Sequence, residues 1–484
     1  MMRYLKSLII IFLVIVVVLP YVNGLNEPGT RTPIKHVINI FFENHTFDNL
    51  FGVYPENSLA NSTQDSIISN LTIPLNLLGN ETLLHRMNAV PIGQFSTQDP
   101  IEGYLAYHQD WNHGMMNNFI NGSGSQSMTY FTASQVSPLW DVAEEYALAD
   151  NYFAPQISES APNTLYYLTG FSPVINDYGP PPFIPFNETI FGELSSYGIS
   201  WGVYVSNASS GSFDMSQYIS GINNYRDNVQ SWNMFLNQVR SGNLPAVSWI
   251  FAQDSDGYDM GAPSNILKGE LWLIHMINSI EESPVWNTST IFVTWDDPGG
   301  YFDQVSPPVF DGIQLGMRLP FLVISPYAKE DYISSTLITH SSILAFIDYN
   351  WKMAALNQFI SKCNIPLDMF DFDIPYYQGY LVRPPLLFNE FPVPASSYFS
   401  LNATFLNYNY SAAFPIKLQI DHSSLPYIDK GSSSFNLSSI QSRLFINRDT
   451  VYLPISMSAY SVLGFMVINS AIVFLIFWRR KNGK

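Results

Sequence analysis

Cysteine is nearly absent from this chain, because Cys363 is the only one among 484 residues. A single cysteine excludes an internal disulfide and any metal site built from several thiolates, and its expected place is the core. Charged residues are also scarce at 12%, whereas hydrophobic residues make up 47%. The chain can therefore build a sizeable core, and uncharged polar side chains must cover much of its surface.

Positive charge is especially scarce. Lys and Arg number 21 against 39 Asp and Glu, which gives a formal net charge of −18. No cluster of Lys or Arg outside the termini offsets this charge. Because a field of this sign repels a polyanion, we expect no nucleic-acid partner.

Long apolar runs occur at the two ends of the chain. Residues 1–24 place Arg3 and Lys6 ahead of an apolar core, which is typical of a secretory signal peptide, although an uncleaved anchor also fits this length. Residues 458–478 are mainly apolar and are followed by the basic tail 479–484. They predict a transmembrane helix with a cytoplasmic tail, against the alternative of a buried terminal helix. We therefore expect a single-pass protein of the cell membrane, with the intervening chain outside the cell.

Glycosylation sequons agree with that topology without deciding it, since they also arise by chance in a chain rich in Asn and Ser. They start at Asn61, Asn70, Asn80, Asn121, Asn187, Asn207, Asn287, Asn402, Asn409 and Asn436. A further sequon starts at Asn44. It is expected to stay unmodified because Asn44 is also a candidate metal ligand.

Two strand-like runs end in acidic and amide side chains. Residues 36–42 are mostly β-branched or aromatic without polar alternation, which predicts a strand covered on both faces in a parallel sheet. Glu43 and Asn44 follow this run, and Asp296 and Asp297 follow a similar run at 290–295. Ligands bind at the carboxyl ends of strands in open α/β sheets. Each pair alone could close a turn or cap a helix, but together they predict a site for a divalent cation.

Ser160 precedes a stretch with the punctuation of a helix, namely Pro162 near its start and Gly170 just past its end. Backbone N–H groups and the helix dipole at such a start favour a phosphate dianion. From the residues alone, two roles for Ser160 remain open: a nucleophile and a plain helix N-cap.

Several spaced motifs carry a family resemblance. ENHTFDNLFG begins at Glu43, and LWDVAEEYALADNYFAPQISESAPNTLYYLTG, TWDDPGGYFDQVSPP and LDMFDF follow in order within residues 34–372. They resemble the phosphoesterase family that contains bacterial phospholipases C and a group of acid phosphatases. The resemblance implies an α/β fold, a three-layer α/β/α sandwich of alkaline-phosphatase-like type, over a catalytic domain at 34–380.

The same resemblance implies roles for individual residues. Ser160 would take the phosphoryl group, beside one divalent metal ion of unknown identity. The expected metal ligands are Glu43, Asn44, Asp296 and Asp297. In the segment YHQDWNHGMMNNF, His108 best matches a family histidine that stands near the phosphate, with His113 as the alternative. Asn163 is expected to contact the substrate, and His340 and Asp303 are expected behind the metal ligands.

This chain departs from the family at Gly261, where the family usually carries a histidine that contacts the bound phosphate. Gln304 also stands where family members often have histidine. Asp256 and Asp259 are close enough in sequence to replace some polar function.

Other segments lie outside the motifs. Residues 54–98 read as an insertion or lid, and residues 381–455 as a small β-rich C-terminal module or stalk. Apolar periodicity also predicts strands at 199–205, 246–251 and 319–325 and helices at 139–149 and 231–239.

We therefore expect an extracellular, membrane-anchored, metal-dependent phosphoesterase that resembles acid phosphatases and works through a phosphoserine intermediate. Small phosphate esters are its expected substrates. The alternatives are a phospholipase C acting on phospholipid head groups and a surface glycoprotein with weakened catalysis.

Overall fold

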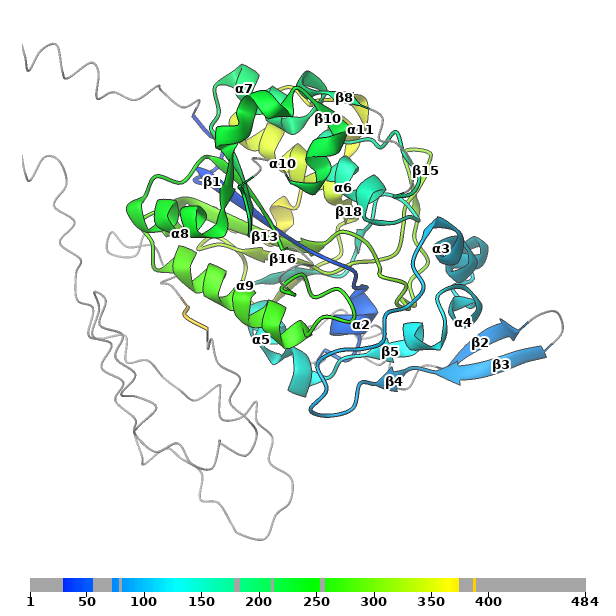
Figure 1. The fold of residues 1–484 in the computed structure, drawn as a ribbon. Helices are drawn as coiled ribbons and strands as arrows, with labels where there is room; N and C mark the ends of the chain where they lie inside the picture. The colour runs from blue at the N-terminus through cyan, green and yellow to red at the C-terminus, as the bar shows by residue number, and fades with distance from the viewer. Residues whose placement is uncertain are drawn as a thin grey trace, which may run out of the picture. The chain divides into compact units, whose positions relative to one another are not determined.

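The computed structural model describes residues 29–54, 72–77, 81–177, 183–209, 213–252, 257–373 and 386–388 (Figure 1). The expected signal peptide, the transmembrane segment, Asp256 and all of the C-terminal module except residues 386–388 lie outside these ranges. Within them, no helix is both long enough and apolar enough to span a membrane.

A central sheet of eight strands forms the middle layer. Its strands, in spatial order, are β11 (Val229–Ser231), β9 (Trp201–Val205), β12 (Val247–Phe251), β1 (His36–Phe42), β13 (Ser289–Trp295), β16 (Phe321–Ile324), β6 (Ala147–Ala149) and β17 (Tyr332–Ser334). β1 runs parallel to both β12 and β13, and its residues from Val37 onward are buried, as the unbroken apolar pattern predicts. β16 is antiparallel to both of its neighbours, so the sheet is mixed rather than wholly parallel.

Helices cover both faces of this sheet (Figure 1). One layer contains α5 (Ala133–Glu145), α8 (Trp232–Ser241) and α9 (Ile266–Glu281), and α9 contacts both of the others. The other contains α6 (Ser160–Thr169), α7 (Ile190–Tyr197), α10 (His340–Trp351) and α11 (Gln358–Lys362). The predicted α/β class and three-layer arrangement are therefore confirmed.

Three further α-helices and five two-stranded sheets lie outside the eight-stranded sheet and its two helix layers, within the described residues. The helices are α2 (Phe47–Phe51), α3 (Tyr104–Trp111) and α4 (Phe119–Gly122). The two-stranded sheets pair β2 (Thr72–Leu77) with β3 (Glu81–Arg86), β4 (Asn88–Ala89) with β5 (Thr129–Tyr130), β7 (Tyr152–Phe153) with β18 (Ile338–Thr339), β8 (Ile184–Pro185) with β10 (Ile219–Ser220), and β14 (Val309–Phe310) with β15 (Ile313–Gln314).

The predicted helix at 139–149 was wrong at its C-terminal end. α5 stops at Glu145, and Ala147–Ala149 enters the sheet as β6 between β16 and β17. All three β6 residues are buried, so their apolar character fits a core strand as well as a helix face. Short apolar runs do not distinguish these two structures.

Candidate active site

The ends of β1 and β13 meet at one edge of the sheet. Phe42 pairs with Trp295, so Glu43 and Asn44 continue beside Asp296 and Asp297. The Asp296 N–H donates to the Phe42 carbonyl at 3.0 Å, and the Asn44 N–H donates to Asp296 Oδ1 at 3.2 Å. The structure thus brings together the four side chains that were predicted as metal ligands.

Asn44 adopts a left-handed backbone conformation, with φ 68°. Asn tolerates this region better than most residues. Gly299, in the loop after Asp297, lies so close that an added Cβ would come within 2.4 Å of the Asn44 carbonyl oxygen. A glycine is therefore required here for the two ligand-bearing loops to approach each other.

Ser160 faces this group from the first turn of α6. Its Oγ lies 3.3 Å from Glu43 Oε2 and 3.2 Å from Asp297 Oδ2, at hydrogen-bonding distance from both. The helix N-cap is Glu159, so the alternative of Ser160 as a plain N-cap is wrong. The backbone N–H of Ala161 already donates to Asp177 Oδ1 at 2.9 Å, so one of the expected anion-binding groups is occupied.

The oxygen donors fit a hard divalent cation. Asn44 Oδ1 and Asp296 Oδ2 are buried and have no hydrogen-bond partner. A buried oxygen without a partner is costly, and a cation would satisfy both atoms. Among the described residues, however, no three His, Cys, Asp or Glu side chains form a group that could already hold a metal ion. The structure shows suitable donors around Ser160 and no closed coordination shell.

Carboxyl groups are concentrated at this buried edge. Burial raises the pKa of Asp297 well above its usual range, and the adjacent Asp296 and Glu102 carboxyl groups raise it further. Burial also raises the pKa of Asp296. The pKa of Glu102 rises to about 8, first through burial and then through Asp99, Asp296 and other nearby acids. A bound cation would stabilise the ionised forms of these groups.

Two residues at the site were missed by the sequence analysis. Asn44 Nδ2 donates to Glu102 Oε1 at 3.0 Å, and the Tyr107 hydroxyl donates to Asp297 Oδ1 at 3.3 Å. Tyr107 lies on α3 and is fully buried. The only sequence signal for Tyr107 was the family-like segment that begins with it. In that segment the prediction named the neighbouring residue, His108.

That histidine, His108, makes its contacts within its own helix. Its Nδ1 lies 2.7 Å from the Tyr104 carbonyl oxygen, and its ring packs against the Tyr104 and Trp111 rings. His113, the alternative, packs against Trp111. Within the described residues, neither histidine hydrogen-bonds to Ser160 or to the predicted ligands, so a catalytic role for His108 stays a prediction.

Asn163 hydrogen-bonds to the backbone just before Ser160. Its Oδ1 accepts from the Gln156 N–H at 2.9 Å, and its Nδ2 donates to the carbonyl oxygens of Ser158 at 2.8 Å and Glu159 at 3.1 Å. Because the fully buried amide is engaged in this way, Asn163 shapes the turn before Ser160. The expected substrate contact of Asn163 stays a prediction.

His340 lies behind Asp296, as the sequence predicted. Its Nε2 is 2.9 Å from the Asp296 carbonyl oxygen, and its Nδ1 is 2.7 Å from the Tyr152 hydroxyl. Burial lowers the pKa of His340 to about 3, so the ring is neutral near pH 7. A neutral imidazole can bridge these two groups and fix the backbone at the end of β13.

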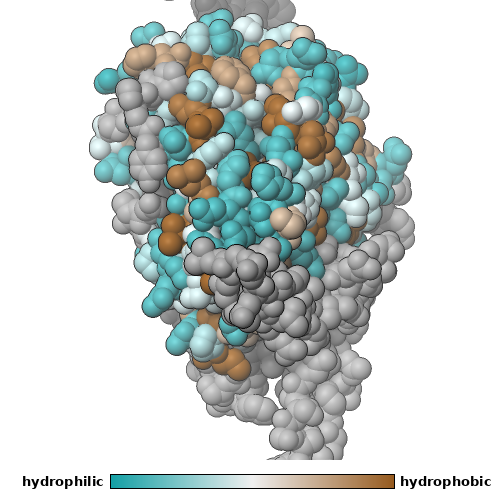
Figure 2. Space-filling view, turned by 90° about the vertical axis from the view of Figure 1, so that its right-hand side faces the viewer, coloured by the Kyte–Doolittle hydropathy of each residue, from teal (hydrophilic) through white to brown (hydrophobic). Residues whose placement is uncertain are grey.

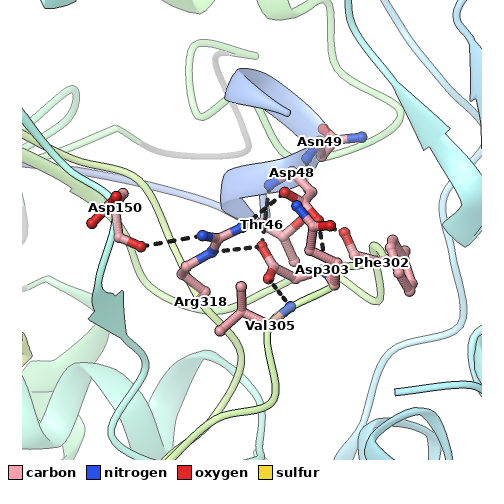
Figure 3. A network of polar contacts seen from close by, with 9 residues as sticks. Thr46, Asp48, Asn49, Asp150, Phe302, Asp303, Val305 and Arg318 are labelled. Carbon is pink, nitrogen blue, oxygen red and sulfur yellow. Dashed lines mark hydrogen bonds and ion pairs between the residues drawn. The ribbon is translucent and has the colours of Figure 1, made fainter. Parts of the chain in front are cut away.

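Asp303 belongs to a buried ionic network centred on Arg318 (Figure 3). Arg318 Nε lies 3.2 Å from Asp303 Oδ2, and Arg318 Nη2 lies 2.8 Å from Asp48 Oδ1. Asp303 Oδ2 also accepts from the Asp48 backbone N–H at 3.2 Å, and the Thr46 hydroxyl donates to the Phe302 carbonyl at 2.8 Å. The network therefore joins residues 46–48, which follow Asn44, to residues 302–303, which follow Asp297.

Gly261 lies against the site without a side chain of its own. An added Cβ would come within 3.0 Å of Glu43 Cβ, so a histidine would need its neighbours to move. The backbone oxygen of the nearby Asp259 accepts from the Glu43 N–H at 2.9 Å. Asp259 is only 3% exposed, and its Oδ2 would lie 3.5 Å from that added Cβ.

Residues 34–354 match the model of the Phosphoesterase family, and the chain belongs to this family. It is 25% identical over 394 residues to non-hemolytic phospholipase C of Burkholderia pseudomallei, covering 66% of this chain and 55% of that protein. It is 25% identical over 416 residues to phospholipase C A of Mycobacterium tuberculosis, covering 72% and 79%. The chain thus spans about half of the first relative. The names of both relatives support the predicted class of enzyme, a phosphoric ester hydrolase.

A plant relative and a solved structure extend these comparisons. Non-specific phospholipase C3 of Arabidopsis thaliana is 22% identical over 389 residues, covering 69% of this chain and 72% of that protein. A protein of the alkaline phosphatase superfamily from Vibrio parahaemolyticus superposes with a TM-score of 0.34 at 13% identity, covering 62% of this chain and 74% of that one.

Proposed function

We propose that this chain hydrolyses phosphoric esters with Ser160 as the nucleophile. The observation that carries the proposal is the Ser160 hydroxyl at 3.2–3.3 Å from two carboxylates at the ends of adjacent strands. Glu43 and Asp297 orient the oxygen, and either is placed to accept its proton. A divalent cation held by Glu43, Asn44, Asp296 and Asp297 would supply charge stabilisation for the phosphoryl oxygens.

The reaction has two steps at phosphorus. In the first, the Ser160 oxygen forms a bond to phosphorus while the bond between phosphorus and the leaving alcohol breaks. In the second, a water oxygen forms a bond to phosphorus, the bond to Ser160 breaks, and the serine regains a proton. In the first step a carboxylate takes the Ser160 proton and passes it to the leaving alcohol. In the second step it takes a proton from the attacking water and returns it to the Ser160 oxygen, so the site is restored after each cycle.

Phospholipids are the substrates that the relatives favour, since the three named here are phospholipases C. Leu105, on the same helix as Tyr107, is 75% exposed. Figure 2 shows the side of the molecule on which α3 lies in Figure 1, and hydrophobic residues are interspersed there among hydrophilic ones. Small phosphate esters remain the second candidate.

The proposal is tested by supplying both ester classes to the purified protein. We expect hydrolysis of a phosphodiester lipid such as phosphatidylcholine, loss of turnover after chelation, and recovery when a divalent cation is returned. Faster hydrolysis of a soluble aryl phosphate would favour the phosphatase alternative. No turnover of either substrate with any added cation would contradict the proposal and favour a catalytically weakened surface protein.

We also propose that the chain is displayed outside the cell and held by residues 458–478, on the sequence evidence of the two apolar termini. Protease applied to intact cells should then release a large soluble fragment that keeps its esterase activity. Cells that yield the protein only after detergent treatment, with no fragment released, would contradict this topology.

A further inference from the structure

We infer that Glu102 and Tyr107 are positioning residues that orient one metal-binding side chain from each strand end. The inference rests on the proposed metal-dependent function. Both residues belong to one short segment, since Glu102 immediately precedes Gly103, the N-cap of α3, and Tyr107 lies within that helix. A single element outside the main sheet therefore contacts the β1 loop and the β13 loop together.

At the β1 loop, Glu102 determines which way the Asn44 amide faces. Asn44 Nδ2 donates to Glu102 Oε1 at 3.0 Å, and Asn44 Oδ1 remains buried without a partner. Only the amide oxygen can bind a cation, because the NH₂ group has no lone pair to offer. Without the acceptor on Glu102, the amide could rotate and present its NH₂ group to the cation. The contact thus selects the orientation in which Asn44 can act as a ligand.

At the β13 loop, Tyr107 helps to distinguish the two oxygens of Asp297. Oδ1 accepts from the Gly299 N–H at 2.7 Å and from the Tyr107 hydroxyl at 3.3 Å, whereas Oδ2 faces Ser160 Oγ at 3.2 Å. The two donors fix the carboxylate plane, so one oxygen is directed toward the nucleophile. Groups that hold ligands in this way typically change metal affinity by about 10- to 100-fold when removed.

The helix that carries Tyr107 is itself held rigidly. Asp110, near the end of α3, accepts hydrogen bonds from the backbone N–H and the hydroxyl of Ser123 at 3.0 and 2.5 Å. Gly122 in α4 lies so close that an added Cβ would come within 2.6 Å of the Ala106 carbonyl oxygen. These contacts pack α3, which carries Tyr107, closely against α4.

The test measures cation binding without turnover. The demetallated full-length protein is titrated with Mn²⁺, and free Mn²⁺ is followed by electron paramagnetic resonance. Tyr107→Phe removes only the hydroxyl and Glu102→Ala removes the acceptor, and each should weaken Mn²⁺ binding about 10- to 100-fold. Tyr104→Phe is the matched control on the same helix and should bind like the parent. Glu102→Gln keeps an acceptor oxygen and should recover most of the affinity lost in Glu102→Ala.

The variants should also unfold at the same temperature as Tyr104→Phe when no metal is present, which separates positioning from a folding defect. Parent-like Mn²⁺ affinity in folded Tyr107→Phe and Glu102→Ala would overturn the inference and leave the proposed function standing. Equal losses in Glu102→Gln and Glu102→Ala would overturn it for Glu102, because charge rather than amide orientation would then explain the effect. A parent protein that binds no cation would overturn both this inference and the metal-dependent function.

Discussion

Phe42 and Trp295 are register partners at the ends of two adjacent parallel strands, β1 and β13. This pairing places Glu43 beside Asp296 without any further bend in either strand. Val37 to Phe42 of β1 and all residues of β13 are buried, so these two strand ends lie at the edge of the core. The position of the candidate site is therefore set by the same packing that stabilises the core.

The Arg318 network predicts a large loss of stability when its cation is removed. Arg318→Met leaves Asp48 and Asp303 buried beside each other without a compensating charge, and breaking such an arrangement costs about 3–5 kcal/mol. Denaturant titration measures the loss in unfolding free energy. Lys362→Met is the control, because its ion pair with Asp311 is partly solvent-exposed and should contribute less than about 1 kcal/mol. Equal stability of the two variants would show that the network is dispensable.

Acidic conditions should stabilise the fold through Glu193 and Asp348. Burial raises the pKa of Glu193 to about 9, with the nearby Asp348 carboxyl as the next cause, and burial raises the pKa of Asp348 to about 7. Both values exceed those of the unfolded chain, so this contribution is complete below about pH 4 and is lost as the pH rises through 7 to 9.

The unfolding temperature measured from pH 5 to pH 9 should accordingly fall with rising pH. Glu193→Gln keeps a neutral side chain and should flatten that fall, whereas Glu188→Gln, at an exposed position, should leave it unchanged. If Glu193→Gln and Glu188→Gln have the same slope as the parent, the buried acid pair does not control the pH dependence.

Glycan mapping tests the proposed extracellular location together with the role of Asn44. Asn187, Asn207 and Asn287 are exposed, and their sequons should carry glycans when the protein passes through a secretory pathway that performs N-glycosylation. Asn44 should be bare, because its Nδ2 donates to Glu102. Peptide mass spectrometry measures the occupancy of each site. A glycan on most copies of Asn44 would remove it from the set of metal ligands.

The sequence predicted those parts of the site that depend on local pattern. The apolar runs before Glu43 and Asp296 predict buried strands that are followed by polar residues. Pro162 and Gly170 indicate where the helix that carries Ser160 begins and ends. Glu102 and Tyr107 could not be found in this way, because they lie 58 and 190 positions from the ligands that they contact. Such pairs depend on how loops return to the sheet.

The sequence pattern also could not predict the direction of each strand in the sheet. β16 was expected as a strand, but nothing in its apolar run indicates that it runs antiparallel to β13. Asn163 illustrates a second limit, since its amide could serve a substrate or the backbone equally well. Only the three-dimensional turn from Gln156 to Glu159 shows that the backbone engages it.

The nucleophile is tested most directly by trapping the transferred group on Ser160. Acid quenching during turnover of the ester that the protein hydrolyses, followed by peptide mass spectrometry, should find the transferred group on Ser160, provided that its hydrolysis is at least partly rate-limiting. This group is phosphocholine for phosphatidylcholine and phosphate for an aryl phosphate. Ser160→Ala should carry no label and should lose about 10³-fold or more in kcat, while cation binding persists because the four ligand side chains remain. A folded, metal-loaded Ser160→Ala variant that turns over nearly as fast as the parent would show that Ser160 is not the nucleophile.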